Sequence, residues 1–384
     1  KKGFKKMKST LDRTPEQVEL VKAMASKNRN VAYEAQAAAA EFVGPVLSEV
    51  MNNAPTLSNM FNSFQFNDDD NPSIPLDLYH DVTDADYLEV YSQSGPGGLP
   101  SNTVIPTHSE LKFTTYRMET AVEFDRRYAA RSRLDVVSKT FSRIAQELLL
   151  KQEHTSANLL LGVLANATTN SLSHVVKSAT ANQFLIDDVN TLITRAKRLN
   201  TAWTGGTPVT GSRGVTDLIV SPEIMGQIRA MAYNPLNTKG SGAGGAKAGG
   251  DVVPGTEDFR NSVYSNAGLS EIYGINITEL NEFGVGQRFN DVYETLIGAT
   301  TGKGGDVGHG AADTFAGTDE IVLGIDRTKE AILKATAVDS ETGAELKLIA
   351  DDQYSVRQQK VGYYGSIEEG RMVLDKRALT GIAV

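Results

Sequence analysis

Two glycine-rich segments of this chain come nearest to known chemical motifs. Gly240-Ser-Gly-Ala-Gly-Gly245 matches the GxGxxG pattern of dinucleotide-binding loops. That pattern holds a pyrophosphate only between a strand and a helix that opens on its last glycine, and the flanking residues predict neither element. Gly298 to Gly304 resembles a phosphate-binding loop, but it is one residue short and has glycine where the metal-binding Ser or Thr belongs. We interpret both segments as loops without a bound nucleotide.

Acidic, imidazole and thiol groups form no recognisable catalytic or metal-binding set either. Asp68-Asp69-Asp70 lacks the glycine and the terminal glutamate of a calcium loop. The chain has no GxSxG, no HExxH and no cysteine, which excludes thiol catalysis, thiolate metal sites and disulfides. No pair of histidines has a metal-ligand spacing; they are His80, His108, His154, His174 and His309. The sequence therefore predicts no enzyme activity, no catalytic residue, no cofactor and no metal site.

Charge is segregated along the first 151 residues. Residues 1–29 contain nine Lys or Arg against three Asp or Glu. Residues 30–111 contain no Lys or Arg and twelve carboxylates, and residues 112–151 contain nine basic against five acidic side chains. Because complementary fields steer association and fix register, this layout favours a chain that docks on copies of itself. The alternative is that the charged blocks are only solvated surface.

Length and composition are those of a globular protein. The 384 residues predict two or three domains, and 40% of them are hydrophobic. The net charge of −9 argues against general binding of nucleic acid, and only residues 1–29 are basic enough to contact phosphate. No apolar run approaches the roughly 18 residues of a membrane span, and the first residues lack the apolar region of a secretory signal. We therefore expect no membrane partner and folding in a reducing cytoplasm.

Hydrophobic periodicity predicts three helices in the first half of the chain. Thr14-Pro-Glu-Gln17 forms a capping box that starts a helix ending near Lys27. An Ala-rich helix over about 32–51 contains Pro45, which we expect to kink or split it. Apolar residues then recur at three- and four-residue steps over 132–161 without Gly or Pro. This pattern predicts one helix of about 30 residues that forms the backbone of the subunit.

A long hairpin is expected between these helices. Residues 52–71 read as irregular, so no strand is predicted before residue 72. Residues 76–91 read as an extended arm, and residues 94–100 are a dense cluster of turn formers. The return strand over 116–125 alternates apolar and charged residues. Such a hairpin has too little core to be stable alone, so we expect it to rest on a neighbouring subunit.

The second half of the chain reads as an α/β region. A helix is predicted over 186–199, and a buried strand at 217–221 leads into a helix that starts at Pro222. Further strands are predicted near 275–277, 320–325 and 331–336. Two closing strands, 354–364 and 371–374, are expected to flank a turn at Glu368-Glu-Gly370.

Three segments carry a resemblance to a known family. Leu218-Ile-Val-Ser-Pro-Glu-Ile224 reads as a strand entering a helix, and Asp319-Glu-Ile-Val-Leu-Gly-Ile-Asp326 reads as a central strand. Gly370-Arg-Met-Val-Leu-Asp-Lys-Arg-Ala-Leu-Thr-Gly381 reads as a strand leading into a short tail. Together with the order of basic arm, hairpin, long helix and α/β region, they resemble the major capsid protein of a tailed double-stranded DNA bacteriophage, with the HK97-type fold. The resemblance covers nearly the whole chain.

This resemblance implies an α+β fold with five parts. These are an N-terminal arm (1–71), an extended β-hairpin loop (72–125), a peripheral domain with the spine helix (126–205), an axial α/β domain (206–349) and closing strands that return to the peripheral domain (350–384).

The resemblance also implies a structural role. The chain would self-assemble into hexamers and pentamers of an icosahedral head, located in the virion and assembled in the host cytoplasm. Its partners would be copies of itself, packaged double-stranded DNA on the interior, scaffold and portal proteins, and a decoration protein. The alternative with the same fold is an encapsulin-like shell of a cellular nanocompartment, although the long arm and loop favour the phage. An unrelated soluble α/β enzyme is the third reading.

The candidate site residues are therefore contacts between subunits. Asp77, Asp81, Asp84, Asp86 and Glu89 of the hairpin would dock on Arg126, Arg127, Arg131, Arg133 and Lys139 of a neighbour. Lys5, Lys6 and Lys8 are expected to face the interior and to meet DNA or a scaffold. The founding member of the family crosslinks a loop lysine to an asparagine of a neighbour. Because residues 30–111 contain no lysine, we expect a shell held by noncovalent contacts or by a decoration protein.

Overall fold

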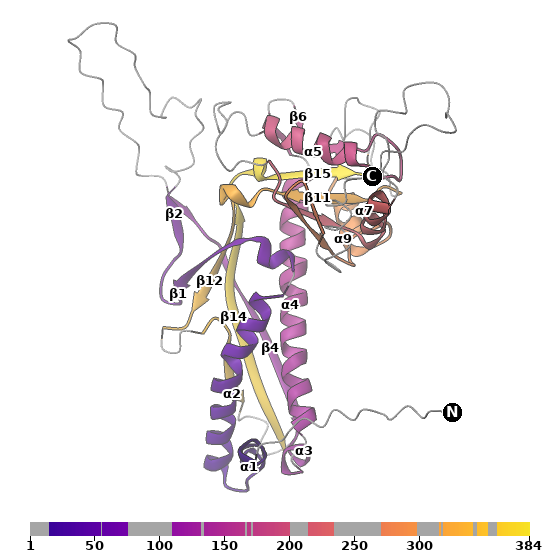
Figure 1. Cartoon of the computed structure of the whole chain (residues 1–384). Coiled ribbons are helices and arrows are strands. Elements are labelled where there is room, and N and C mark those ends of the chain that lie inside the picture. The colour runs from indigo at the N-terminus through magenta and orange to yellow at the C-terminus, as the bar shows by residue number, and fades with distance from the viewer. Residues whose placement is uncertain are drawn as a thin grey trace, which may run out of the picture.

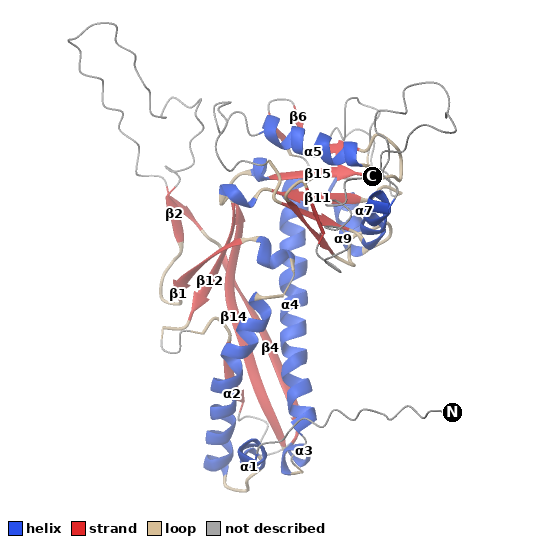
Figure 2. Cartoon of the chain, viewed as in Figure 1, coloured by secondary structure: helices blue, strands red, loops and turns tan. Residues whose placement is uncertain are grey.

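The computed structural model describes residues 15–54, 56–75, 110–131, 134–165, 167–169, 172–199, 214–233, 270–297, 315, 318–340, 344–351 and 359–384. Both glycine-rich segments, the tip of the predicted hairpin and the first fourteen residues lie outside these ranges. The described chain has an elongated shaft with a second body at one end of it (Figure 1). Both parts contain helices and strands, which confirms the predicted α+β class (Figure 2).

The shaft is built on one long helix. Helix α4 (Leu134–Leu164) has 31 residues, which corresponds to about 46 Å. Its apolar residues at three- and four-residue steps from Val137 to Leu148 are buried, and most residues between them are exposed. The predicted spine helix is thus confirmed, with its end three residues later than expected.

Helix α4 and the N-terminal helices cover one face of a five-stranded sheet. Helix α1 (Pro15–Met24) packs on α2 (Arg29–Asn52), and the short α3 (Arg126–Ala130) leads into α4. Buried residues of α2 and α4 share a cluster with the sheet residues Met118, Phe124 and Tyr363. On this face α2 lies at the left and α4 at the right in Figure 1, and the two helices contact each other.

Helix α2 continues through Pro45, so of the two predicted outcomes, a kink or a split, the split is wrong. A proline within a helix removes the hydrogen bond to the carbonyl four residues earlier. Here that carbonyl belongs to Glu41, which is exposed, so water can hydrate it. The helix begins at Asn28, whose side chain accepts a hydrogen bond from the Asn30 N–H at 3.2 Å.

The sheet of the shaft has the order β1-β12-β14-β13, with β4 on the free side of β14. Strand β1 pairs in parallel with β12, and the other pairs are antiparallel. Its strands are β1 (Asn62–Asn67), β12 (Ile332–Val338), β14 (Lys360–Val373), β13 (Lys347–Asp351) and β4 (Thr115–Asp125).

Two sequence expectations fail in this sheet. Residues 52–71 are not irregular, because they contain the 3₁₀ turn η1 (Leu57–Met60) and β1. Residues 368–370 form no turn, because β14 runs unbroken for 14 residues. Strand β4 has the predicted alternation of buried and exposed residues, and it pairs with β14 over its whole length. The outgoing arm of the predicted hairpin, 76–91, lies outside the described residues, so that hairpin stays a prediction. The base of the predicted loop is a different antiparallel pair, β2 (Ser73–Pro75) with β3 (Glu110–Lys112).

The second body is a six-stranded sheet with helices on both faces. Alternate residues of β8 point to opposite faces, so Leu218 and Val220 lie in one cluster and Ile219 in another. The strand order is β7 (Val175–Lys177), β15 (Leu379–Ala383), β11 (Ile321–Ile325), β8 (Asp217–Val220), β10 (Ile275–Glu279) and β9 (Ser270–Ile272). Helices α5 (Ile186–Leu199) and α7 (Pro222–Tyr233) cover one face, and α9 (Arg288–Ile297) with the end of α4 covers the other. The predicted helices and strands of this region are confirmed within a few residues.

Two glycines allow this close layering. A Cβ on Gly324 of β11 would lie 2.9 Å from the Thr380 Oγ1 and 3.3 Å from Leu192 of α5. A Cβ on Gly381 of β15 would lie 3.0 Å from Leu164 of α4. A larger residue at either position would push a helix away from the sheet.

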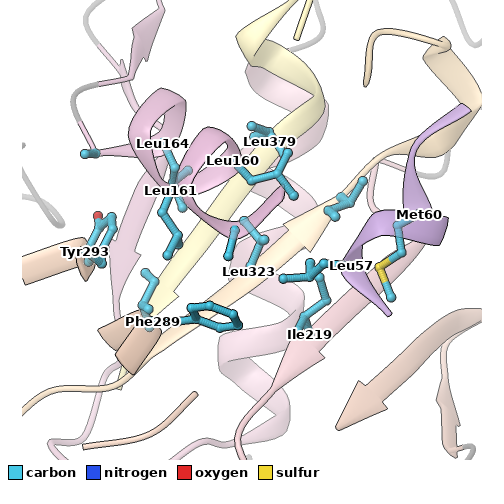
Figure 3. Close-up of a cluster of buried hydrophobic side chains, with 14 of the residues drawn as sticks. Leu57, Met60, Leu160, Leu161, Leu164, Ile219, Phe289, Tyr293, Leu323 and Leu379 are labelled. Atoms are coloured by element: carbon cyan, nitrogen blue, oxygen red, sulfur yellow. The ribbon is translucent and has the colours of Figure 1, made fainter. Parts of the chain in front are cut away.

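Helix α4 joins the two bodies through a common core (Figure 3). Leu160, Leu161 and Leu164 at its end contact residues of η1, β8, β11, α9 and β15 in a single buried cluster. The shaft and the second body therefore share apolar contacts as well as a continuous helix. The remaining short elements are β5 (Thr168–Thr169), β6 (Leu172–Ser173), η3 (Arg327–Lys329) and η4 (Lys376–Ala378).

Strand pairing does not follow the linear order of the predicted domains. Strand β12, from the segment 206–349, lies in the sheet of the shaft, and β15, from the segment 350–384, lies in the six-stranded sheet. The domain boundaries themselves remain predictions. No helix in the described part of the chain is long and apolar enough to cross a membrane.

Candidate functional site

The most distinctive polar site lies in the middle of the shaft and is buried. Arg371 of β14 and Glu369, two residues before it, form an ion pair at 2.8 Å, and their side chains are 1% and 0% exposed. Tyr116 of β4 donates to the Glu369 Oε1 at 2.7 Å, and the Gln152 amide of α4 donates to the Oε2 at 2.9 Å. A buried charge is tolerated only when its hydrogen-bonding capacity is filled, and Glu369 meets this condition.

The guanidinium group of Arg371 extends the site to the N-terminal part of the chain. It donates to the Ser58 Oγ of η1 at 2.8 Å and also to the Gln152 carbonyl and the Ser156 Oγ of α4. Its centre lies 5.7 Å from the Phe61 ring centroid. The site thus connects β14, β4, α4 and the segment between α2 and β1.

Glu153, which follows Gln152 in α4, also binds the segment between α2 and β1. Its Oε2 accepts a hydrogen bond from the Leu57 N–H at 2.9 Å, at the start of η1. Burial raises the pKa of Glu153 from its ordinary 4.5 to about 7, and Glu282 adds to the rise, while the N–H groups of η1 and Arg371 oppose it. The neighbouring His154 contacts Glu282 at 3.1 Å. These contacts hold together η1, α4 and the chain before α9.

Four of the predicted basic contacts fall in described residues, at the α3 end of the shaft. Arg126 is occupied within the subunit, because its guanidinium donates to the carbonyls of Ala25 and Ser26 at the end of α1. Arg127 pairs with Asp125 at 2.9 Å, yet its side chain is exposed. Arg131 and Lys139 are exposed. The structure therefore places these four residues at one end of the shaft and leaves three of them accessible.

The remaining predicted contacts lie outside the described residues. They are Arg133, the acidic residues Asp77, Asp81, Asp84, Asp86 and Glu89, and the N-terminal Lys5, Lys6 and Lys8. The docking of one set on the other stays a prediction.

Sequence reasoning missed the buried ion pair because it placed Glu369 in a turn. The alternation of Tyr363, Ile367, Glu369 and Arg371 on one face is a strand pattern, but two of its four members are charged. Strand β1 was missed as well. Its signal in the sequence is the alternation of Phe64 and Phe66 with polar residues.

The described residues contain no group of three or more His, Asp or Glu that could hold a metal ion. A groove of about 700 Å³ between α2 and β13 is lined largely by small and apolar residues, among them Ala37, Gly44 and Leu348. His174 is buried and serves the fold, since its Nδ1 lies 2.9 Å from the Leu379 carbonyl and its Nε2 lies 2.8 Å from the Thr169 Oγ1.

Comparisons with known proteins give structural similarities only. No family model matches the chain, and no curated protein matches it. Among solved structures, a capsid chain of the native GTA particle is 12% identical over 86% of this chain and 89% of that chain, with a TM-score of 0.49. The capsid of the cyanophage P-SCSP1u is 15% identical over 84% and 86%, with a TM-score of 0.46. The SrpI encapsulin complex from Synechococcus elongatus PCC 7942 is 11% identical over 72% and 75%, with a TM-score of 0.37.

We predict that Arg371→Met destabilises the isolated subunit by about 3–5 kcal/mol, because Glu369 would remain buried without its cation. Urea unfolding of the dissociated subunit measures the loss. Arg117→Met is the matched control on β4, where the pair with Glu119 is half exposed and is worth about 0–1 kcal/mol. Equal losses in the two variants would contradict the role of the buried pair.

We predict that Glu153→Gln flattens the pH dependence of stability. The pKa of this carboxyl is higher in the folded chain, about 7 against 4.5, so the folded state binds the proton more tightly. The contribution of Glu153 to the free energy of unfolding is therefore fully present below pH 4.5. It is lost as the pH rises to about 7, and the total loss is about 3 kcal/mol.

Urea unfolding at pH 5, 6, 7 and 8 measures this effect. The Gln side chain keeps an oxygen for the Leu57 N–H, so the variant should be the more stable protein at pH 8. The exposed Glu147 on the same helix supplies the control variant Glu147→Gln. If the free energy of unfolding changes equally with pH in Glu153→Gln and in the unsubstituted chain, burial does not raise the pKa of Glu153.

Proposed function

We propose that this chain is a self-assembling shell subunit, the major capsid protein of a tailed double-stranded DNA phage with the HK97-type fold. It would form hexamers and pentamers of an icosahedral head that encloses packaged DNA. Its role would be structural rather than enzymatic.

The observation that carries the proposal is the architecture of the shaft. A 31-residue helix supports one sheet along its length and a second, helix-covered sheet at its end. Such a body is long and thin, so much of its surface lies on its flanks, where copies can pack side by side. The proposed loop would leave this body between β2 and β3, which form an antiparallel pair beside β1.

The segments that carry the sequence resemblance occupy matching elements. Leu218 to Ile224 spans β8 and the start of α7, and Asp319 to Asp326 spans β11. Gly370 to Gly381 spans the end of β14, η4 and the start of β15. Each segment therefore has the strand or strand–helix form that the resemblance implies.

Further parts of the proposal concern segments outside the described residues. Lys5, Lys6 and Lys8 would face the interior and contact DNA or a scaffold, since their charge favours binding to phosphate. Portal, scaffold and decoration proteins would be additional partners, and the virion would be the final location.

The first test is assembly of the purified protein. We expect closed icosahedral particles by negative-stain microscopy, and nuclease-resistant double-stranded DNA inside particles isolated from the cells that produce them. A monodisperse monomer by light scattering at high concentration would contradict the shell. Particles that contain protein cargo and no DNA would identify the encapsulin-like alternative.

We also predict that the acidic loop docks on the α3 end of a neighbouring shaft. Asp84→Lys with Asp86→Lys should lower particle yield, and Arg131→Glu with Lys139→Glu should partly restore it. Because each exposed pair is worth only about 0–1 kcal/mol, the effect should depend strongly on salt. Arg131 and Lys139 suit the rescue because both are exposed.

Asp69→Lys with Asp70→Lys is the matched control, because these carboxylates are exposed and precede the loop. If the loop variant forms particles with unchanged yield and salt dependence, the docking prediction is wrong.

A further inference from the structure

The outer face of α2 carries an apolar line that no described residue covers. Phe42, Val46 and Val50 are 76%, 50% and 55% exposed. They follow one another at four-residue steps, so they form one ridge on the helix surface, about 12 Å long. Large exposed apolar side chains gathered in one line mark an interaction surface.

An acidic ridge runs beside the apolar one. Glu41 and Glu49 are exposed and lie one residue before Phe42 and Val50, with Pro45 between them. Residues 30–111 contain no Lys or Arg, so no cation on α2 after its first residue offsets these carboxylates. Within the described residues, neither glutamate forms an ion pair. The surface therefore suits a partner that is basic and has an apolar part.

The exposed face of α4 has these properties. Arg143 and Lys151 are exposed and eight residues apart, with Glu147 between them. Leu150, beside Lys151, is 43% exposed. The long aliphatic parts of Arg and Lys can cover apolar side chains while their charged ends stay in water.

The acidic ridge of α2 and the basic residues on the exposed face of α4 match in spacing as well as in charge. Glu41 and Glu49 are eight residues apart, as are Arg143 and Lys151, which is about 12 Å on each helix. With Glu41 opposite Arg143 and Glu49 opposite Lys151, the acidic Glu147 faces the uncharged Pro45. Ridges of four-residue spacing pack into one another in the helix crossing that is commonest in globular proteins, near −50°.

We propose that the outer face of α2 docks on the exposed face of α4 of a second copy of this chain. Within one subunit the two helices lie on one face of the sheet, with α2 at the left and α4 at the right in Figure 1, so each copy can offer one helix to each of two neighbours. Such a head-to-tail contact closes into a ring when it is repeated by rotation. The inference rests on the proposed self-assembly and names the surfaces of one contact within it.

Because the chain has no cysteine, introduced thiols test the contact directly. A tagged copy with Val46→Cys and an untagged copy with Leu150→Cys are co-expressed and treated with a short bismaleimide. Each copy has one thiol, so a crosslinked tagged–untagged dimer must join two chains. We expect at least five times more of this dimer than with Thr191→Cys on α5 as the second partner, an exposed position on the helix that covers the face of the six-stranded sheet opposite the end of α4.

Charge reversal tests the register. Glu41→Lys with Glu49→Lys in the Val46→Cys copy should lower the crosslinked fraction at least fivefold, and Arg143→Glu with Lys151→Glu in the Leu150→Cys copy should restore it. All four positions are exposed, and circular dichroism confirms that the variants are folded.

Negative-stain microscopy of the same samples separates this inference from the proposed function. Particles without preferential crosslinking between positions 46 and 150 would overturn the α2–α4 contact and leave the shell intact. That result would mean that another segment or another protein covers the α2 ridge. The absence of both particles and crosslinks would overturn both proposals, and crosslinking that charge reversal leaves unchanged would overturn the proposed register.

Discussion

The buried pair of Arg371 and Glu369 is the interaction on which the shaft depends. The two charges lie on one strand, but their hydrogen bonds reach β4, α4 and η1. An ion pair removed from water contributes little net stability by itself, and its loss on one side is costly. Such a pair therefore acts through geometry, because its hydrogen bonds to Tyr116, Gln152 and Ser58 form only when these four elements are placed together. The unbroken β14 follows from the same constraint, since a turn at Glu369 would expose the carboxylate and leave Gln152 and Tyr116 without their acceptor.

The second constraint is the shared apolar core at the end of α4. Leu160, Leu161 and Leu164 continue the helix of the shaft into the cluster that also contains β8, β11 and β15. The chain crosses between the two sheets several times, so β12 lies in one and β11 in the other although only six residues separate them. A rigid helix of about 46 Å then fixes the relative position of the two bodies, which the proposed shell subunit would need in order to present its surfaces at constant geometry.

The surfaces of the shaft differ in character. One face of the sheet is filled by helices, while its other face carries charged residues of β4 such as Arg117, Glu119 and Glu123, which are exposed. The outer side of α2 is apolar and acidic, and the outer side of α4 is largely basic. Burial of apolar side chains supplies most of the affinity in protein association, whereas charge sets register and the rate of encounter. The proposed contacts combine both contributions. Among the described residues, no group of three or more His, Asp or Glu could hold a metal ion.

The sequence by itself determined the elements whose signal is local. The spine helix, α5, β8 with α7, and β11 follow from periodicity, from proline at a helix start and from continuous apolar runs, and all are confirmed. Tertiary structure alone decided the partners: β4 with β14, more than 230 residues later, and β1 with β12. It also decided that Pro45 remains within a helix and that Glu369 and Arg371 are buried. The physical reason is that strand pairing and the burial of a charge depend on groups supplied by distant segments. A local pattern of charged residues reads as surface or turn until those partners are in place.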